Sequence, residues 1–399
     1  MRLVLVLLIA LLFAAPAHAA PRALAAVGED EGFVLSGDRV VFTQTNGRKI
    51  RVLSMPLAGG AAQTIFTYTA PPGRLAYGEQ LVATPTRVAM LLAHSDRNRQ
   101  STTTQVLAGT ATGGWSVVVP PRASGKDLPF ANVVQLAGDD VVTYERLSWE
   151  QDEFELALYD PLRRVLPLPV GTLFHGDLAI RSERGPLDEA PRERVLVTNW
   201  RTGEPVTAAE FDDIIKSYEV ATDGRALVTV GDTLLEIAPG GAVTRLTEAV
   251  DSPMRAGERV LFFRTDGIGV FERNGAKRRF GVRTEQLERF VTDGNNVLWS
   301  ANGCLLLAPI TDPAARAPGP GPCARSEAAL TLSVKGRTAR VKVRCVAAPA
   351  GGCRGTIELR IAGQRAGQAP VRLAVGKTVE RTVQLSRSGA ARATFLERG

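Results

Sequence analysis

Short apolar runs recur through the first 310 residues of the chain, and each lies next to a turn that contains Gly or Asp. The starts of the seven runs are 34 to 53 residues apart, with a mean near 43. No long window keeps a 3.6-residue apolar period, so strands are expected and helix is expected to be scarce. The runs start at Val40, Val88, Val141, Leu178, Ala226, Val260 and Val297.

A second apolar run that ends at a Gly turn follows the first, as in Ile50 to Leu57 before Gly59-Gly60. Such a meander, repeated every 40 to 45 residues or so, is typical of a propeller blade with four strands. One twisted four-stranded sheet cannot cover its own faces, whereas radial stacking buries both. The sequence therefore predicts an all-β chain with a β-propeller of about seven blades over residues 20–310.

Three of the turns carry a family resemblance. Ser36 to Phe42, Thr222 to Val228 and Thr292 to Trp299 resemble the Asp-Gly turn and following strand of TolB-like propeller repeats. The second run lacks this turn signature, which leaves six to eight blades open. The resemblance implies the fold and not a function, because propellers serve binding, scaffolding and catalysis alike.

The composition changes after the repeats. A Pro/Gly-rich linker is expected at residues 311–324. Residues 325–399 alternate apolar and polar positions in four runs, which predicts a small immunoglobulin-like β-sandwich. The stretch from Arg340 to Thr356 resembles tail domains of secreted actinobacterial proteins.

The first residues read as a secretory signal. Arg2 precedes an apolar run from Leu3 to Phe13, and Ala17-His18-Ala19 provides a small-x-small cleavage site, so residues 1–19 are expected to be removed. No later stretch is long and apolar enough for a membrane span. We expect a secreted or envelope-associated protein outside the cytoplasm, with no membrane span in the mature chain.

The four cysteines fit an oxidising compartment. Cys345 and Cys353 flank a short Pro/Gly turn and are expected to form one disulfide, leaving Cys304 to pair with Cys323. The other pairings remain open, and zinc is the alternative, although neither a C-x2-C pair nor a nearby His supports it.

Charge is unevenly distributed. Residues 324–399 contain 15 Lys/Arg against 4 Asp/Glu, whereas the rest of the mature chain is slightly acidic. Such a basic domain could hold the protein on an anionic cell-wall polymer or on lipid headgroups. Phe395 is its only aromatic residue, so single-stranded nucleic acid is not expected as a partner.

Motifs for chemistry are scarce. The mature chain has two histidines, His94 in an expected loop and His175 beside a turn, and neither accompanies a nucleophile motif. The Asp-rich turns do not match a calcium loop, and no Gly-rich phosphate loop is present. No catalytic residue, metal ligand or cofactor is therefore assigned.

Loop length provides the candidate site. The connection between the second and third strands of a blade is short in the last three blades but long in the second, third and fourth, which predicts a raised lobe on one face. Its ligand-binding candidates combine an aromatic platform with charged groups and would suit a sugar or a basic peptide. They are Trp149, Glu150, Asp152, Glu153, Asp96 and Arg97.

The sequence thus favours a non-catalytic binding or scaffold protein outside the cytoplasm, with an unknown protein or glycan partner. The lobe would be the contact surface, and the basic domain an envelope attachment or spacer. The alternative is an enzyme acting on envelope glycans or peptides through scattered carboxylates, with Glu150 and Asp152 as the best pair. Two facing carboxyl groups with raised pKa values would favour this alternative.

Overall fold

The structure is a computed structural model, and its regular elements are all β-strands. Among the described residues there is no helix, and hence none long and apolar enough to cross a membrane. The expected all-β class is confirmed. The described residues are 22–27, 31–96, 101–124, 128–148, 150, 153–160, 162–184, 192–248, 251–264, 267–272, 275–280, 289–301, 304–311, 327–347, 353–373 and 377–397.

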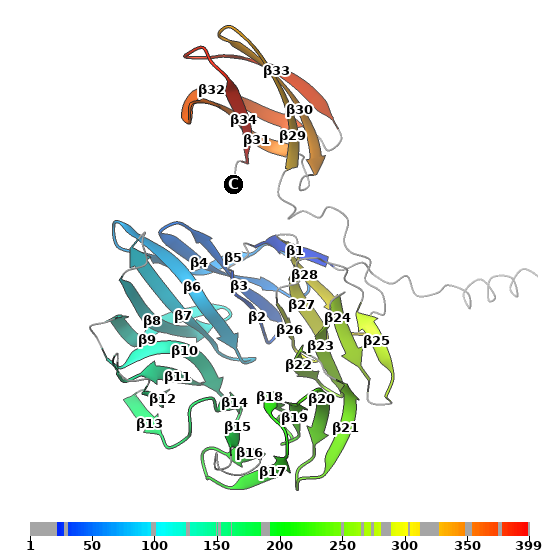
Figure 1. The fold of residues 1–399 in the computed structure, drawn as a ribbon. Coiled ribbons are helices and arrows are strands. Elements are labelled where there is room, and N and C mark those ends of the chain that lie inside the picture. Colours follow the sequence, from blue (N-terminus) through cyan, green and yellow to red (C-terminus); the bar gives the residue numbers. More distant parts are fainter. Residues whose placement is uncertain are drawn as a thin grey trace, which may run out of the picture.

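The described part of residues 22–309 forms seven four-stranded antiparallel sheets arranged around a ring (Figure 1). The first three sheets contain β2 (Phe33–Ser36), β3 (Arg39–Asn46), β4 (Lys49–Pro56), β5 (Gln63–Thr69); β6 (Arg74–Ala83), β7 (Val88–Asp96), β8 (Thr102–Thr110), β9 (Gly113–Ala123); β10 (Phe130–Ala137), β11 (Asp140–Arg146), β12 (Phe154–Asp160) and β13 (Leu162–Leu166). The next three contain β14 (Leu173–His175), β15 (Leu178–Arg184), β16 (Glu193–Asn199), β17 (Pro205–Phe211); β18 (Ile215–Val220), β19 (Ala226–Val230), β20 (Thr233–Ile237), β21 (Val243–Glu248); β22 (Asp251–Ala256), β23 (Arg259–Arg264), β24 (Gly267–Phe271) and β25 (Lys277–Phe280).

The seventh sheet joins the two ends of the ring. It contains β26 (Phe290–Thr292), β27 (Asn296–Ala301), β28 (Cys304–Pro309) and, as its outermost strand, β1 (Arg22–Ala26). β1 pairs antiparallel with β28, with Arg22 opposite Leu307. This closure by the first strand was not predicted from the sequence.

The ring is continuous at its inner edge. The first strand of every sheet contacts the first strand of the next, from β2 through β6, β10, β14, β18 and β22 to β26, and β26 contacts β2. Each of the seven predicted apolar runs lies in the second strand of one sheet. The β-propeller architecture inferred from the repeat is therefore what the chain adopts.

Apolar clusters fill the interfaces between neighbouring sheets. Val40, Val41 and Phe42 of β3 are all completely buried, although they point to opposite faces of their sheet. One face packs toward the seventh sheet and the other toward the second. Because both faces are covered, the runs read as continuous apolar stretches instead of alternating ones.

Two Asp residues of the first turns, Asp293 and Asp223, cap the backbone. The Asp293 carboxylate accepts hydrogen bonds from the amides of Asn295 (2.8 Å) and Asn296 (2.6 Å). Gly294, which follows Asp293, has a φ of 91°, a conformation that favours glycine. Asp223 accepts the amide of Arg225 at 3.1 Å in the same manner. Within the described residues no group of three or more His, Cys, Asp or Glu side chains could hold a metal ion.

Residues 327–397 form a separate small sandwich in their described part. One sheet has the order β29–β30–β33 and the other β32–β31–β34. Val341, Val343, Ile357 and Leu359 from the two sheets pack in one core. The strands are β29 (Glu327–Lys335), β30 (Thr338–Ala347), β31 (Cys353–Ile361), β32 (Gln364–Leu373), β33 (Thr378–Gln384) and β34 (Ala391–Glu397).

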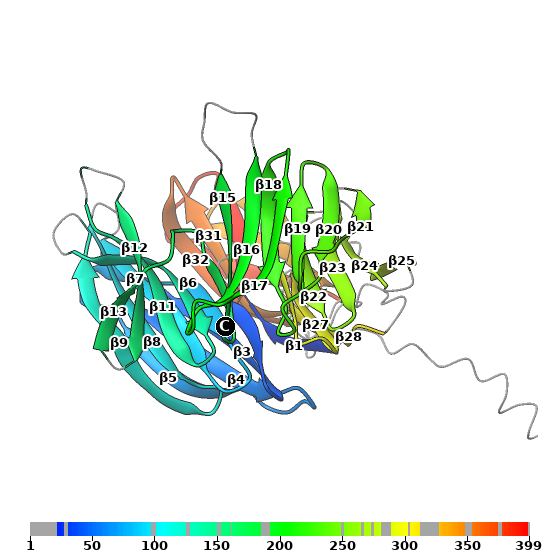
Figure 2. The same ribbon diagram turned by 90° about the horizontal axis from the view of Figure 1, so that it is seen from below.

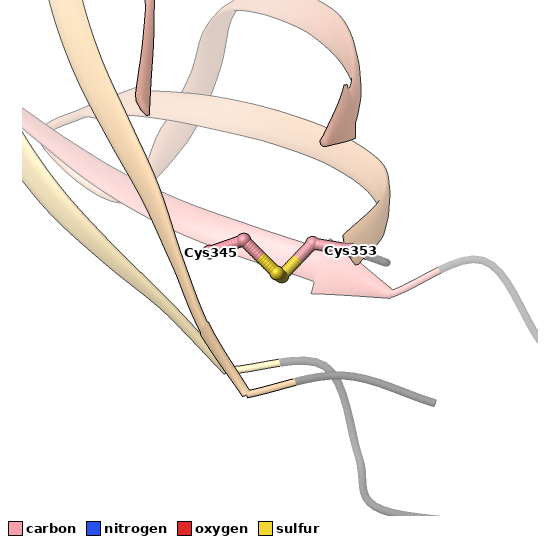
Figure 3. Close-up of a disulfide and its surroundings, with 2 residues drawn as sticks. All are labelled: Cys345 and Cys353. Carbon is pink, nitrogen blue, oxygen red and sulfur yellow. A yellow bond between two sulfur atoms is a disulfide. The ribbon is translucent and has the colours of Figure 1, made fainter. Parts of the chain in front are cut away.

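Cys345 and Cys353 form a disulfide between the ends of β30 and β31, as predicted (Figure 3). The bond therefore joins the two sheets of the sandwich. Cys304 is also disulfide-bonded. Cys323, its predicted partner, lies outside the described residues, as do residues 1–19 and the linker from residue 312 onward.

The Cys345–Cys353 bond is expected to stabilise the sandwich by closing a short loop in the unfolded chain. With a sequence separation of 8, the entropic account gives about 2.6 kcal/mol, or roughly 80-fold in the unfolding equilibrium. The double variant Cys345→Ser/Cys353→Ser should lose that protection at the amides of β30 and β31 in hydrogen–deuterium exchange. Unchanged exchange there, with β27 as the internal reference, would contradict this expectation.

Candidate functional site

The candidate site lies on one face of the ring, which we call the connection face. Here the second strand of each sheet turns into the third, and the fourth strand leads to the next sheet. Figure 2 shows this face at the top, along the upper ends of β15, β16, β19 and β20. All second-to-third connections emerge on this face because the strands of each sheet are antiparallel and consecutive.

The connections on this face differ in length as expected from the sequence. Three neighbouring sheets have long ones, at residues 97–101, 147–153 and 185–192. The connections of the last three sheets are two residues long, at 231–232, 265–266 and 302–303. The long connections follow one another around the ring, and we call them together the lobe.

The structure describes three of the six predicted site residues. Asp96 is the last residue of β7 and lies opposite Arg74 of β6. Glu150 and Glu153 are exposed in the connection between β11 and β12, where the Glu153 carbonyl accepts the amide of Leu147 at 2.8 Å. Arg97, Trp149 and Asp152 lie outside the described residues. Two of the three described candidates thus belong to one connection, between β11 and β12.

An aromatic stack supports the base of this connection. The rings of Tyr144 on β11 and Phe154 on β12 are stacked with centroids 4.7 Å apart. The Arg146 guanidinium lies 5.3 Å from the centre of the Phe154 ring. These residues occupy neighbouring pairing positions on the hairpin, where cross-strand side chains interact. The stack fixes the strands from which Glu150 and Glu153 extend.

A buried carboxylate lies on the same hairpin. Glu145 is completely buried and accepts hydrogen bonds from the hydroxyls of Thr143 (2.7 Å) and Tyr159 (2.6 Å). The Nε of Arg163 donates to its second oxygen at 3.0 Å. Burial, together with the hydrogen bond to Glu145, raises the pKa of Tyr159. Every oxygen of this carboxylate is occupied by the protein, so the cluster holds β11, β12 and β13 together.

His94 was expected in a loop, and this expectation was wrong. It lies within β7, is 7% exposed, and its Nδ1 is 2.7 Å from the hydroxyl of Tyr68. The hairpin is longer than the polar sequence suggested, because Ser95 and Asp96 continue the strand. Burial and the nearby Arg74 charge lower the pKa of His94, which keeps the ring neutral near pH 7.

An ion pair joins the two strand ends that flank the third lobe connection, at residues 185–192. Glu193, the first residue of β16, is 5% exposed and binds Arg184 of β15 at 2.8 Å. Its other oxygen accepts the amide of Ile215 in the next sheet at 2.8 Å. Glu193 thus joins the β15–β16 hairpin to its neighbour.

Side chains at the inner edge join consecutive sheets. The amide oxygens of Gln80 and Gln135 accept backbone N–H groups of the next first strand, from Val134 (3.0 Å) and Phe174 (3.3 Å). Glu219 of β18 makes the same kind of bond, since its carboxylate accepts the amide of Arg255 on β22 at 2.7 Å. This set was not recognised in the sequence, because a single Gln or Glu within a strand carries no signal of its own.

Among the carboxyl groups of the described residues, that of Glu219 has a raised pKa. Burial raises its pKa to about 7, although the Arg255 amide and charge oppose the shift. Arg255 in turn pairs with Glu236 of β20. No second raised carboxyl faces it among the described groups, so the facing pair expected of the enzyme alternative is not found within this part of the chain.

Comparison with known proteins adds no family. No protein-family model matches the chain, and no curated protein matches it. A solved prolyl endopeptidase is similar with a TM-score of 0.47 and 9% identity, over 78% of this chain and 54% of that one. The acylaminoacyl peptidase of Pyrococcus horikoshii gives 0.43 and 12%, over 70% and 50%. This chain therefore spans about half the length of each of these two peptidases.

An oligogalacturonate lyase in complex with manganese is also similar, with a TM-score of 0.40 and 13% identity, over 70% of this chain and 76% of that one. At such low identities these likenesses concern the fold, and they place no reaction or substrate on this chain.

The raised pKa of Glu219 makes the stability of the contact between β18 and β22 dependent on pH. A folded-state pKa of about 7 means that the unfolded chain releases this proton first, so stability is lost as pH rises from below 4.5 through 7. Glu219→Gln should remove that loss, leaving the variant more stable than the wild type at pH 8 by about 1 to 3 kcal/mol. Urea unfolding at pH 4 and pH 8 measures the difference, with the exposed Glu79→Gln as control. Equal pH dependence in wild type and Glu219→Gln would contradict the assignment.

Proposed function

We propose that this chain is an exported, non-catalytic binding or scaffold protein whose lobe is the contact surface. The observation that carries the proposal is the clustering of three long connections on adjacent sheets of one face, while the last three sheets have two-residue turns. Loops on a rigid scaffold are where binding is most often found. The basic sandwich would attach the protein to the envelope or serve as a spacer.

The roots of the lobe support this role. Each of the three hairpins is fixed by a specific contact, namely His94 with Tyr68, Tyr144 with Phe154, and Arg184 with Glu193. Contacts that hold the hairpin ends in place reduce the entropy lost when a partner binds. Glu150 and Glu153 extend from the middle hairpin as exposed acceptors, next in sequence to Trp149 and Asp152.

Export rests on two supports. The first residues have the pattern of a secretory signal, and the sandwich has a disulfide of the kind that persists in oxidising compartments. A relationship to TolB-like propellers and an immunoglobulin-like origin of the sandwich belong to the same proposal.

Substitution in the middle connection tests the contact surface. Trp149→Ala, alone or with residues 186–191 replaced by a two-residue turn, should weaken partner binding by roughly 30-fold, as for a central aromatic anchor. Binding of the full chain to solubilised envelope glycan strands, stem peptides and envelope proteins would be measured by biolayer interferometry.

The matched control is a change on the opposite face. Thr202 lies in the connection between β16 and β17, and Thr202→Ala should leave binding unchanged. If the lobe variants kept full affinity for every partner that binds the wild type, the lobe would not be the contact surface. Conversion of a bound glycan or peptide to product would show that the chain is an enzyme.

A further inference from the structure

The outer face of the sheet β29–β30–β33 carries a row of cations. Along β30, Val341 and Val343 are completely buried, whereas Arg340, Lys342 and Arg344 are exposed. Successive side chains of a strand point to opposite faces, so the three cations share one face. Their spacing along the strand is about 6.7 Å.

Hydroxyl groups flank this row. In the register of the sheet, Arg340 lies between Ser333 of β29 and Thr382 of β33. Lys342 lies between Thr331 and Glu380, and Arg344 has Thr378 on one side. Glu380 is the single acid opposite the row. The face therefore offers a line of positive charge bordered by small hydrogen-bond donors.

The charges of the row are not neutralised within the described part of the chain. No ion pair or hydrogen bond there involves the side chains of Arg340, Lys342 or Arg344, and Lys342 does not reach Glu380. Other arginines of the sandwich behave differently. Arg360 pairs with Glu358, and Arg337 donates to the carbonyls of Leu385 and Ser386.

We propose that Arg340, Lys342 and Arg344 form a binding stripe for a linear phosphodiester polymer. Regularly spaced cations with adjacent hydroxyl donors match a backbone whose phosphates recur along one line, because Arg, Lys, Ser and Thr are the usual donors to phosphate oxygens. This inference rests on the proposed attachment role of the sandwich and names its partner class and residues.

The shape of the row favours a polymer over other anions. A bilayer surface would meet cations spread over an area, whereas here they occupy the central strand of a three-stranded sheet. Single-stranded nucleic acid is bound with aromatic platforms, and the one aromatic residue of this domain, Phe395, packs against the sandwich core.

The test compares two variants with equal loss of charge. The first is Arg340→Gln/Lys342→Gln/Arg344→Gln, and the control is Arg360→Gln/Arg365→Gln/Arg392→Gln on the other sheet of the same sandwich. The full chain would be titrated with lipid-free poly(glycerol phosphate) between 0.05 and 0.5 M salt. The probes for other partners are phosphatidylglycerol vesicles and oligo(dT).

The stripe variant should bind the polymer about 10- to 100-fold more weakly at 0.1 M salt, and the slope of log K against log salt should fall by about 2. The control variant should stay within about threefold of the wild type. Equal losses in both variants would show an effect of net charge alone and overturn the proposal. So would binding to vesicles or oligo(dT) with none to the polymer.

Fractionation of native cells separates this inference from the proposed attachment role. If salt releases the wild type from the envelope and the stripe variant is already in the medium, the result supports both the stripe and the attachment role. If both variants stay on the envelope, attachment survives and the stripe is wrong. The wild type could instead be found in the medium at low salt, while the purified wild-type chain binds the polymer and the stripe variant does not. The attachment role then fails, and the assignment of the stripe as a polymer site stands.

Discussion

The burial of both faces of every four-stranded sheet is the constraint on which the propeller depends. A sheet whose second strand is completely buried on both sides, as at Val40, Val41 and Phe42, needs a neighbour on each side. Only a closed ring supplies two neighbours to every member, and the pairing of β1 with β28 completes the last sheet of that ring. The second-to-third turns of the connection face start in second strands, such as β3, that are packed on both faces.

Polar groups between the sheets add specificity to this apolar packing. Gln80, Gln135 and Glu219 each supply an acceptor for a backbone N–H that would otherwise lack a partner at the inner edge. A side-chain amide is uncharged and accepts this hydrogen bond equally well at any pH. A carboxyl group also accepts it, but its ionised form loses hydration free energy on burial, so its contribution to stability depends on its protonation. The joint between the fifth and sixth sheets is therefore chemically different from those formed by the two glutamines.

The sequence pattern predicted the strands correctly where burial on both faces determines the residue type. All seven apolar runs coincide with second strands, and the Cys345–Cys353 bond was placed correctly because a short turn limits the choice of partner. β1 was missed because Arg22–Ala26 is short and rich in alanine, and its partner is remote in sequence. The lengths of the connections could be estimated, but His94 was misplaced since polar residues at the end of a long hairpin resemble a loop. The stack of Tyr144, Phe154 and Arg146 depends on cross-strand register, which composition does not encode.

The pairing of Arg22 with Leu307 also constrains the order in which the chain can fold. During vectorial synthesis or translocation, β1 emerges first, yet its hydrogen-bonding partner follows 285 residues later. The first strand must therefore wait, with its backbone groups unpaired, until all other sheets have been produced. Because β1 can pair only after β28 has been produced, closure of the ring is a late step of folding that depends on a contact between residues remote in sequence. A chain that crosses a membrane before β28 emerges is thus kept from premature closure by its own topology.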